Sequence, residues 1–234
     1  MSQNVLVVHG GGPTAVINAS LYGVIEEAKR NPEVGKVYGA IGGTGAIFSE
    51  TFIDLTSFDD EKLKLLLHTP ASAIGSSRYP LYEKDYEKMV DIFKKHDIKY
   101  VLLNGGNGTM DACGHIYEVC KDQDIKVVGI PKTIDNDIAM TDHSPGYGSA
   151  ARFIAASTQE VGEDVKSLPI HVCIMEAMGR NAGWITAASA LARRKQGDAP
   201  HLIYLPERNF NEDEFLEDVS RLQKKQGGVV VLVS

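Results

Sequence analysis

The chain has few cysteines, no long hydrophobic run and no excess of positive charge, and each absence excludes a class of protein. Three cysteines in 234 residues, without paired short spacing, argue against a disulfide framework or a zinc site. No apolar run reaches membrane length, and no signal peptide is recognisable. The net charge of −7 argues against a nucleic-acid partner, which would require a basic face. We therefore expect a cytoplasmic globular protein without nucleic-acid or membrane partners.

Segments typical of strands alternate with segments typical of helices, which predicts an α/β fold with mostly parallel sheets and helices on both faces. The 43% content of hydrophobic residues can supply the core of one large or two modest domains. Strands are predicted at residues 5–8, 36–40, 100–103, 126–130, 170–175, 202–205 and 228–233. Helices are predicted near residues 15–29, 60–67, 82–95, 110–121, 149–165, 182–192 and 211–225. The segment 142–148 interrupts this pattern, which predicts one domain at residues 1–145 and a second at 146–234.

The segment 131–137, Pro-Lys-Thr-Ile-Asp-Asn-Asp, concentrates polar groups directly after a predicted strand. The carboxyl ends of parallel strands form the ligand-binding edge of an open α/β sheet, so this segment is a candidate active site. Asp135 could take a proton from a substrate hydroxyl there, and Lys132 could neutralise a phosphate. A solvated Asp/Asn turn is the alternative for such a cluster taken alone.

Two glycine-rich segments favour the interpretation as an active site. Residues 9–12, His-Gly-Gly-Gly, and residues 104–109, Asn-Gly-Gly-Asn-Gly-Thr, each follow a predicted strand and precede a predicted helix. Glycines let the backbone approach a ligand closely, and a helix N-terminus offers N–H groups and a positive dipole end to a phosphate. Neither segment has the spacing of the phosphate loop or of the dinucleotide fingerprint. The sequence therefore predicts a phosphate site of another type.

These segments, with Gly75-Ser76-Ser77-Arg78 and Met178-Gly179-Arg180, resemble the motifs of the phosphofructokinases in the same order along residues 5–234. The resemblance implies two Rossmann-like domains of three layers, α/β/α, one binding the phosphoryl donor and the other fructose 6-phosphate. It also implies Mg²⁺ as cofactor, a homo-oligomer of two or four subunits, and a role in glycolysis. Family members are longer, so we expect a C-terminally truncated chain whose second domain is incomplete.

The resemblance implies a role for each matching residue in phosphoryl transfer to the 1-hydroxyl of fructose 6-phosphate. Asp135 is the implied general base, and the other implied catalytic residues are Lys132, Thr133 and Asp137. The implied donor-binding residues are Gly11, Arg78, Gly106, Asn107, Gly108 and Thr109. The implied sugar-phosphate-binding residues are Thr133, Asp135, Met178, Gly179 and Arg180.

Two positions give opposite indications of the phosphoryl donor. Gly108 stands where pyrophosphate-dependent members carry an aspartate that blocks the α-phosphate of ATP. Lys132 stands where pyrophosphate-dependent members carry a lysine. The combination resembles the ATP-dependent members of the pyrophosphate-like branch. We weigh the open position at Gly108 more heavily and expect ATP as donor, with pyrophosphate as the alternative.

Two departures from the family pattern indicate a possible second class of function. Asn107 replaces the aspartate that binds Mg²⁺, which keeps an oxygen ligand but loses its charge. His171 replaces an arginine that in many members reaches the sugar phosphate of a neighbouring subunit. The alternative is therefore a weakly active or regulatory paralogue that binds sugar phosphate.

Overall fold

The computed structural model describes residues 3–234, whose contacts divide the chain into two compact units between Thr133 and Ile134. We call them unit 1 and unit 2. The boundary predicted at residues 145 and 146 lies further along the chain. Within the loop before that boundary, Asn136 Oδ1 accepts a hydrogen bond from the Ser144 N–H at 2.7 Å. The same side chain donates to the carbonyl of Asp142 at 3.3 Å. Ile134 at the start of the loop packs against the apolar core of unit 2, so the loop folds as part of that unit.

Unit 1 is built on a five-stranded sheet in the order β3-β2-β1-β4-β5. β3 is antiparallel to its neighbour, whereas the other four strands are parallel. The strands are β1 (Gln3–His9), β2 (Val34–Ala40), β3 (Phe52–Asp54), β4 (Ile98–Gly105) and β5 (Lys126–Pro131). All four parallel strands were predicted. β3 was missed because three residues are too few to show a period-2 pattern.

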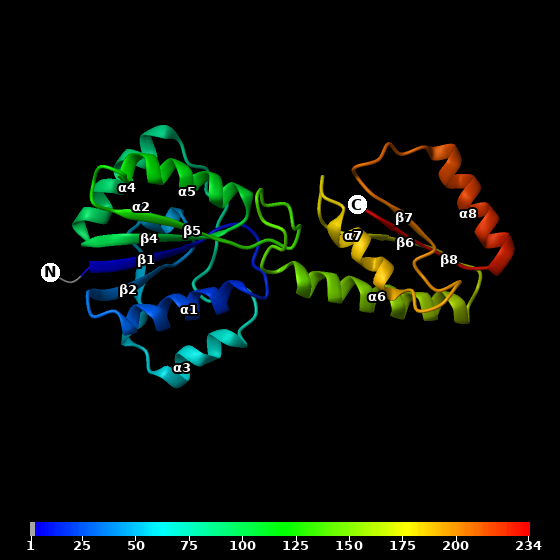
Figure 1. Ribbon diagram of the computed structural model, residues 1–234, viewed down its shortest axis with the longest axis horizontal. Coiled ribbons are helices and arrows are strands. Elements are labelled where there is room, and N and C mark those ends of the chain that lie inside the picture. Colours follow the sequence, from blue (N-terminus) through cyan, green and yellow to red (C-terminus); the bar gives the residue numbers. More distant parts are fainter. Residues whose placement is uncertain (1–2) are drawn as a thin grey trace. The chain divides into compact units, whose positions relative to one another are not determined.

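Helices cover both faces of this sheet because alternate residues of each strand point to opposite sides. Leu6 and Val8 of β1 belong to one buried cluster, and Val5 and Val7 belong to another. Figure 1 shows α1 and α3 on one side of the strands and α2, α4 and α5 on the other. The helices are α1 (Ile17–Arg30), α2 (Gly45–Phe48), α3 (Asp60–Lys64), α4 (Glu83–Lys95) and α5 (Asn107–Cys120), with 3-10 turns at Leu55–Ser57 and Leu65–Leu67. The predicted three layers are therefore present in unit 1.

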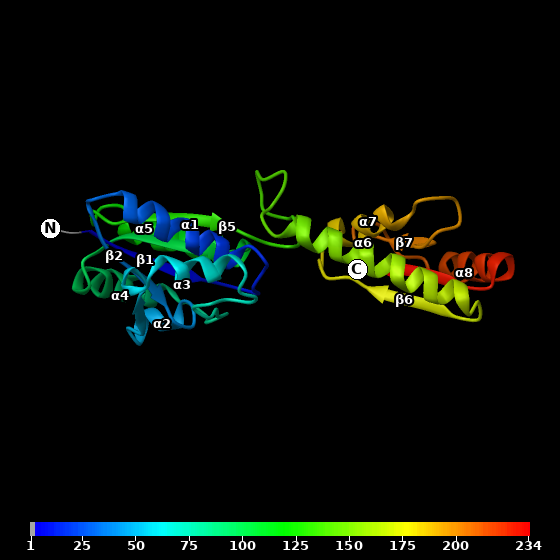
Figure 2. The ribbon, with the colours of Figure 1, turned by 90° about the horizontal axis from the view of Figure 1, so that it is seen from below.

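Unit 2 contains a smaller parallel sheet of three strands in the order β6-β8-β7. In Figure 1, α6 and α8 lie on opposite sides of these strands, and in Figure 2 α6 runs in front of them. The elements are α6 (Tyr147–Ser167), β6 (Val172–Glu176), α7 (Trp184–Ala188), a 3-10 turn at Ser189–Ala192, β7 (Leu202–Tyr204), α8 (Glu212–Gln226) and β8 (Val229–Val233). The single helix predicted at 182–192 is thus a short helix followed by a 3-10 turn. Within residues 3–234, no helix is long and apolar enough to span a membrane.

The strand order of unit 1 creates a topological switch between β1 and β4. The chain passes from β1 to β2 on one side, and β4 then pairs with the other side of β1. In open α/β sheets, ligands bind at the carboxyl ends of the strands at such a point. His9 and Asn104 are register partners there, so both glycine-rich turns leave the sheet side by side.

Candidate active site

Thr109 joins the two glycine-rich turns of unit 1. A Cβ added at Gly10 would lie 2.2 Å from its Oγ1, and one added at Gly105 would lie 2.1 Å from the same atom. Real Cβ atoms do not approach other atoms so closely, so both positions require glycine. Thr109 itself is buried. This residue, predicted to bind the donor, therefore fills the contact between the turns with its side chain.

The first turn is also tied to the segment that carries Arg78. Gly11, in the left-handed region with φ of 73°, donates its N–H to the Ser77 carbonyl at 3.1 Å. Ser76 Oγ donates in return to the Gly11 carbonyl at 2.6 Å. Arg78 follows directly and is exposed. The fold thus places the predicted donor-binding residues Gly11 and Arg78 on adjacent segments that are joined by hydrogen bonds.

The second turn presents the N-terminus of α5. Gly106 is its N-cap, and the N–H groups of Thr109 and Met110 both donate to the Gly106 carbonyl at 2.9 Å. Asn107 and Gly108 form the exposed first turn of the helix, and a Cβ at Gly108 would meet nothing within 4 Å. The first N–H groups of an α-helix and its positive dipole end suit an anion. The four donor-binding residues predicted from Gly106 to Thr109 therefore lie at one helix end.

Lys132 places a cation beneath both turns. It is only 3% exposed, and its ammonium donates to the carbonyl of Gly12 in the first turn. Its backbone N–H donates to the carbonyl of Gly105 in the second turn at 3.0 Å. Thr133 is also buried. Water screens a buried charge little, so this ammonium attracts a negatively charged ligand bound at the two turns.

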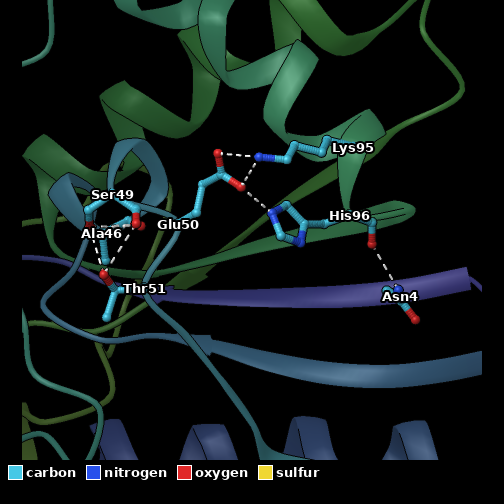
Figure 3. A network of polar contacts seen from close by, with 7 residues as sticks. All are labelled: Asn4, Ala46, Ser49, Glu50, Thr51, Lys95 and His96. Atoms are coloured by element: carbon cyan, nitrogen blue, oxygen red, sulfur yellow. Dashed lines mark hydrogen bonds and ion pairs between the residues drawn. The ribbon is translucent and has the colours of Figure 1, made fainter.

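A polar network supports a third segment of this region, residues 41–51. Gly42 N–H donates to the Ile74 carbonyl at 2.8 Å, and a Cβ at Gly43 would lie 2.6 Å from the Ser77 nitrogen. At the other end of the segment, Glu50 bonds Lys95 Nζ at 2.7 Å and His96 Nε2 at 2.6 Å, as Figure 3 shows. Hydrogen bonds from Lys95 and then His96 lower the pKa of the Glu50 carboxyl. The segment is therefore fixed at both ends.

In unit 2, the predicted catalytic carboxylates lie in the loop that follows Thr133. Ile134 packs against the apolar core of this unit, and Asn136 adopts φ of 55°. Asp135 is half-buried and Asp137 is exposed. The hydrogen bonds of Asn136 to the chain at 142–144 set the path of this loop. The amide of Asn136, which was given no role from sequence, thus positions the two carboxylates.

The second predicted motif of unit 2 forms a tight turn after β6. Gly179 has φ of 143°, and a Cβ there would lie 2.2 Å from the Ala182 carbonyl oxygen. Arg180 is exposed and held at φ of 50°, a strained conformation for a residue with a side chain. Glu207 Oε1 accepts a hydrogen bond from the Gly183 N–H at 2.7 Å, which closes the turn. Sequence reasoning missed Glu207, although a carboxylate shortly after the end of β7 is a usable signal.

The predicted magnesium ligand, Asn107, offers one neutral amide oxygen. In the part of the chain that the structure describes, no three His, Cys, Asp or Glu side chains are grouped as a metal site. Mg²⁺ commonly binds proteins through one or two groups while donor phosphates and water complete its shell. The exposed position of Asn107 at the α5 N-terminus fits that mode. His171 lies exposed before β6, where its Nδ1 is 3.0 Å from the Leu168 carbonyl.

Comparisons with known proteins show the family of this chain. The family described as Phosphofructokinase matches residues 4–234. The chain belongs to the phosphofructokinase family. A pyrophosphate–fructose 6-phosphate 1-phosphotransferase of Rhodospirillum rubrum is 43% identical over 98% of this chain and 57% of that protein. A crystal structure of pyrophosphate-dependent phosphofructokinase from Marinobacter aquaeolei matches with a TM-score of 0.91 and 40% identity, over 99% of this chain and 60% of that chain.

An ATP-dependent 6-phosphofructokinase of Amycolatopsis methanolica is 29% identical over 97% of this phosphofructokinase chain and 49% of that protein. The chain thus spans less than two thirds of the length of each of these relatives. The predicted family and the predicted α/β fold are confirmed.

Proposed function

We propose that this phosphofructokinase transfers a phosphoryl group from pyrophosphate to the 1-hydroxyl of fructose 6-phosphate. The observation that carries this proposal is the buried Lys132 ammonium bonded to the first glycine-rich turn. A fixed cation at the sheet's switch point suits a compact, highly charged donor. The pyrophosphate-dependent relative of Rhodospirillum rubrum, at 43% identity against 29% for the ATP-dependent one, supports the same donor.

Pyrophosphate as the proposed donor replaces the ATP expected from sequence, because Lys132 is now given more weight than Gly108. The space beside Gly108 is open, as expected, but it lies at the exposed start of α5 and leaves room for either donor. Lys132 acts on both turns through its side chain and its backbone N–H. A buried charge changes the binding of an anion more than an open surface position does, because water screens it less.

Unit 1 is the proposed donor-binding part. The N-terminus of α5, Gly11, Arg78 and Lys132 hold the phosphates and balance the charge that spreads over the transferred group. Arg78 suits this role because its planar donors can bind phosphate at two points. Asn107 would hold Mg²⁺ together with the donor, and the bound ion would supply positive charge to the phosphates.

Unit 2 supplies the proposed acceptor-binding part. Asp135 takes the proton of the 1-hydroxyl of the sugar. The oxygen of that hydroxyl forms the new bond to phosphorus while the bridging P–O bond of pyrophosphate breaks. Asp137, together with Thr133 at the end of unit 1, orients the sugar, and Arg180 binds it from the turn shaped by Met178 and Gly179. We further propose that the protein assembles as a homo-oligomer.

The test is a phosphorylation assay on the complete natural chain with fructose 6-phosphate and Mg²⁺, run in parallel with pyrophosphate and ATP. Turnover with pyrophosphate and little with ATP is the expected result. Turnover with ATP alone would mean that the open Gly108 position decides the donor, and the proposal would be wrong. A Lys132→Met variant sharpens the test, with the exposed Lys126→Met as its control. We expect only the former to lose pyrophosphate turnover, by about 100-fold, since it removes a charge-assisted contact to phosphate.

Asn107 favours one second candidate, a weakly active or regulatory paralogue that binds sugar phosphate. The exposed amide supplies an oxygen to Mg²⁺ without the charge of a carboxylate. Asn107→Asp separates the two functions in the same assay. Little change in turnover supports the enzyme, and a large gain from a low starting rate supports the paralogue.

A further inference from the structure

His9 is a buried histidine at the candidate site to which the proposed reaction assigns no role. It is the last residue of β1, immediately before Gly10, and its side chain is fully buried. On β1 it shares the face of Val5 and Val7, which pack toward α1. Histidine is seldom buried without a hydrogen-bonding reason, so its partners are informative.

The hydrogen bonds of Ser72 fix the tautomer of His9. Ser72 Oγ lies 2.7 Å from His9 Nδ1 and donates to the Gly75 carbonyl at 2.7 Å. A serine hydroxyl has a single proton, and the carbonyl of Gly75 can only accept. The proton between His9 and Ser72 must therefore come from His9, whose Nδ1–H donates to Ser72 Oγ. The imidazole is thus a donor in a chain that runs from His9 through Ser72 to Gly75.

These hydrogen bonds join two parts of the proposed donor site, the first glycine-rich turn and the segment that carries Arg78. Ser72 and Gly75 begin the segment that continues through Ser76 and Ser77 to Arg78. Above His9, Gly11 exchanges hydrogen bonds with Ser76 and Ser77 at 2.6 and 3.1 Å. The glycine-rich turn and the Arg78 segment are therefore connected at two levels, and His9 makes the buried connection.

The imidazole at this position is neutral at ordinary pH. Burial, and next the positive charge of Lys132, lower the pKa of His9 to about 4. A charged imidazole would place a second cation near the ammonium that holds the Gly12 carbonyl. A neutral ring can hold Ser72 without competing with Lys132 for the donor's charge.

We propose that His9 is a positioning residue for donor binding, whose Nδ1–H holds Ser72 and thereby keeps the Arg78 segment against the glycine-rich turn. His9 acts through Ser72 and Gly75 and does not touch the substrate. The proposal rests on the proposed function, because it takes Arg78 and Gly11 as the cradle of the donor phosphates.

The test compares His9→Leu, His9→Asn and Ser72→Ala in the complete natural chain. Asparagine can place an amide N–H near the position of Nδ1, whereas leucine cannot. We expect His9→Leu and Ser72→Ala to raise the KM for pyrophosphate about 10-fold. This is the change in affinity expected from the loss of one buried hydrogen bond. The kcat and the KM for fructose 6-phosphate should stay within about 3-fold, and His9→Asn should restore most of the donor KM. His68→Leu, at an exposed histidine, is the control and should change nothing.

Two results would overturn the proposal. One is an unchanged donor KM in Ser72→Ala, which is informative even if His9→Leu fails to fold. The other is an equal loss for both substrates in His9→Leu and His9→Asn, which would indicate a structural role only. If the unaltered protein turns over neither donor, the proposed function fails on its own. Calorimetric titration of the same variants with magnesium pyrophosphate then still decides the role of His9, with the same fold-changes expected in Kd.

Discussion

Both units place their candidate residues in turns directly after strands, but they hold these turns by different means. In unit 1 the two turns at the ends of β1 and β4 are packed on each other through Thr109 and bonded to the buried Lys132. In unit 2 the turn after β6 is exposed at Arg180, strained there at φ of 50°, and closed by one carboxylate, Glu207.

The difference follows from what each turn is proposed to bind. Phosphates are recognised well by backbone N–H groups and fixed charge, so glycines and a buried lysine can form a pre-organised cradle. A sugar phosphate offers hydroxyls as well, which side chains such as Asp135 and Arg180 can read from partly exposed positions. Ligand recognition in unit 1 is therefore proposed to depend on the packing of its turns, and in unit 2 on individual side chains.

The largest effect should come from Asp135→Asn in unit 2. Loss of the proposed general base should lower kcat about 1,000-fold, since general-base catalysis typically supplies about 10²–10⁴-fold. The KM for fructose 6-phosphate should change by less than about 3-fold, because asparagine keeps the shape and one acceptor oxygen. Steady-state kinetics on the complete chain measures both. Asp142→Asn, at an exposed carboxylate in the same loop, is the matched control, and equal losses in the two variants would remove the catalytic assignment.

The packing of unit 1 is tested by Gly105→Ala. The new Cβ would lie 2.1 Å from Thr109 Oγ1, and such overpacking should lower the free energy of unfolding by about 3 kcal/mol. Urea unfolding followed by circular dichroism measures the change. Gly114→Ala in α5, where a Cβ meets nothing within 4 Å, is the control. It should raise stability by about 0.5–1 kcal/mol because alanine favours the helix. An undisturbed Gly105→Ala protein would show that the two turns are not locked together.

A pH titration of stability should reveal His9 in unit 1. Its pKa is about 4 in the folded protein against 6.5 in the unfolded chain. Between pH 6.5 and pH 4 the unfolded chain binds a proton at His9 that the folded protein does not bind. The stabilising contribution of the neutral His9 is therefore present above pH 6.5 and is lost as the pH falls toward 4. The loss should be about 2 kcal/mol between pH 7 and pH 5 relative to His9→Asn. If the free energy of unfolding had the same pH dependence in the unaltered protein and in His9→Asn, the burial of a neutral imidazole would be contradicted.

The smallest effect should come from relieving strain at Arg180. Glycine accepts φ of 50° more readily than any residue with a Cβ, so Arg180→Gly should be about 1 kcal/mol more stable than Arg180→Ala. Both variants should raise the KM for fructose 6-phosphate, since both lack the guanidinium. The single tryptophan, Trp184, lies in unit 2 and reports its unfolding by fluorescence. Equal stability of the two variants would mean that the turn after β6 carries no strain at Arg180.

Sequence patterns were sufficient for the parallel strands of both units and for the positions of the glycine-rich turns. They were less sufficient at short or irregular elements: β3, α2 and the 3-10 turns have too few residues to show a period. Lys132 and Asp135 were proposed as site residues because they follow an apolar segment that is typical of a strand. Glu207, Glu50 and His9 were not, because their roles depend on hydrogen bonds to residues 24 to 63 positions away in the chain.

The sequence by itself determined the alternation of strands and helices, the glycines at the strand ends and the set of chemical groups available, because these depend on local periodicity and residue type. Only the tertiary structure decided that Thr109 fills the space between the two turns, that Lys132 is buried beneath them and that His9 is neutral. These properties arise from packing and from loss of water around groups distant in the chain, and no local pattern encodes either.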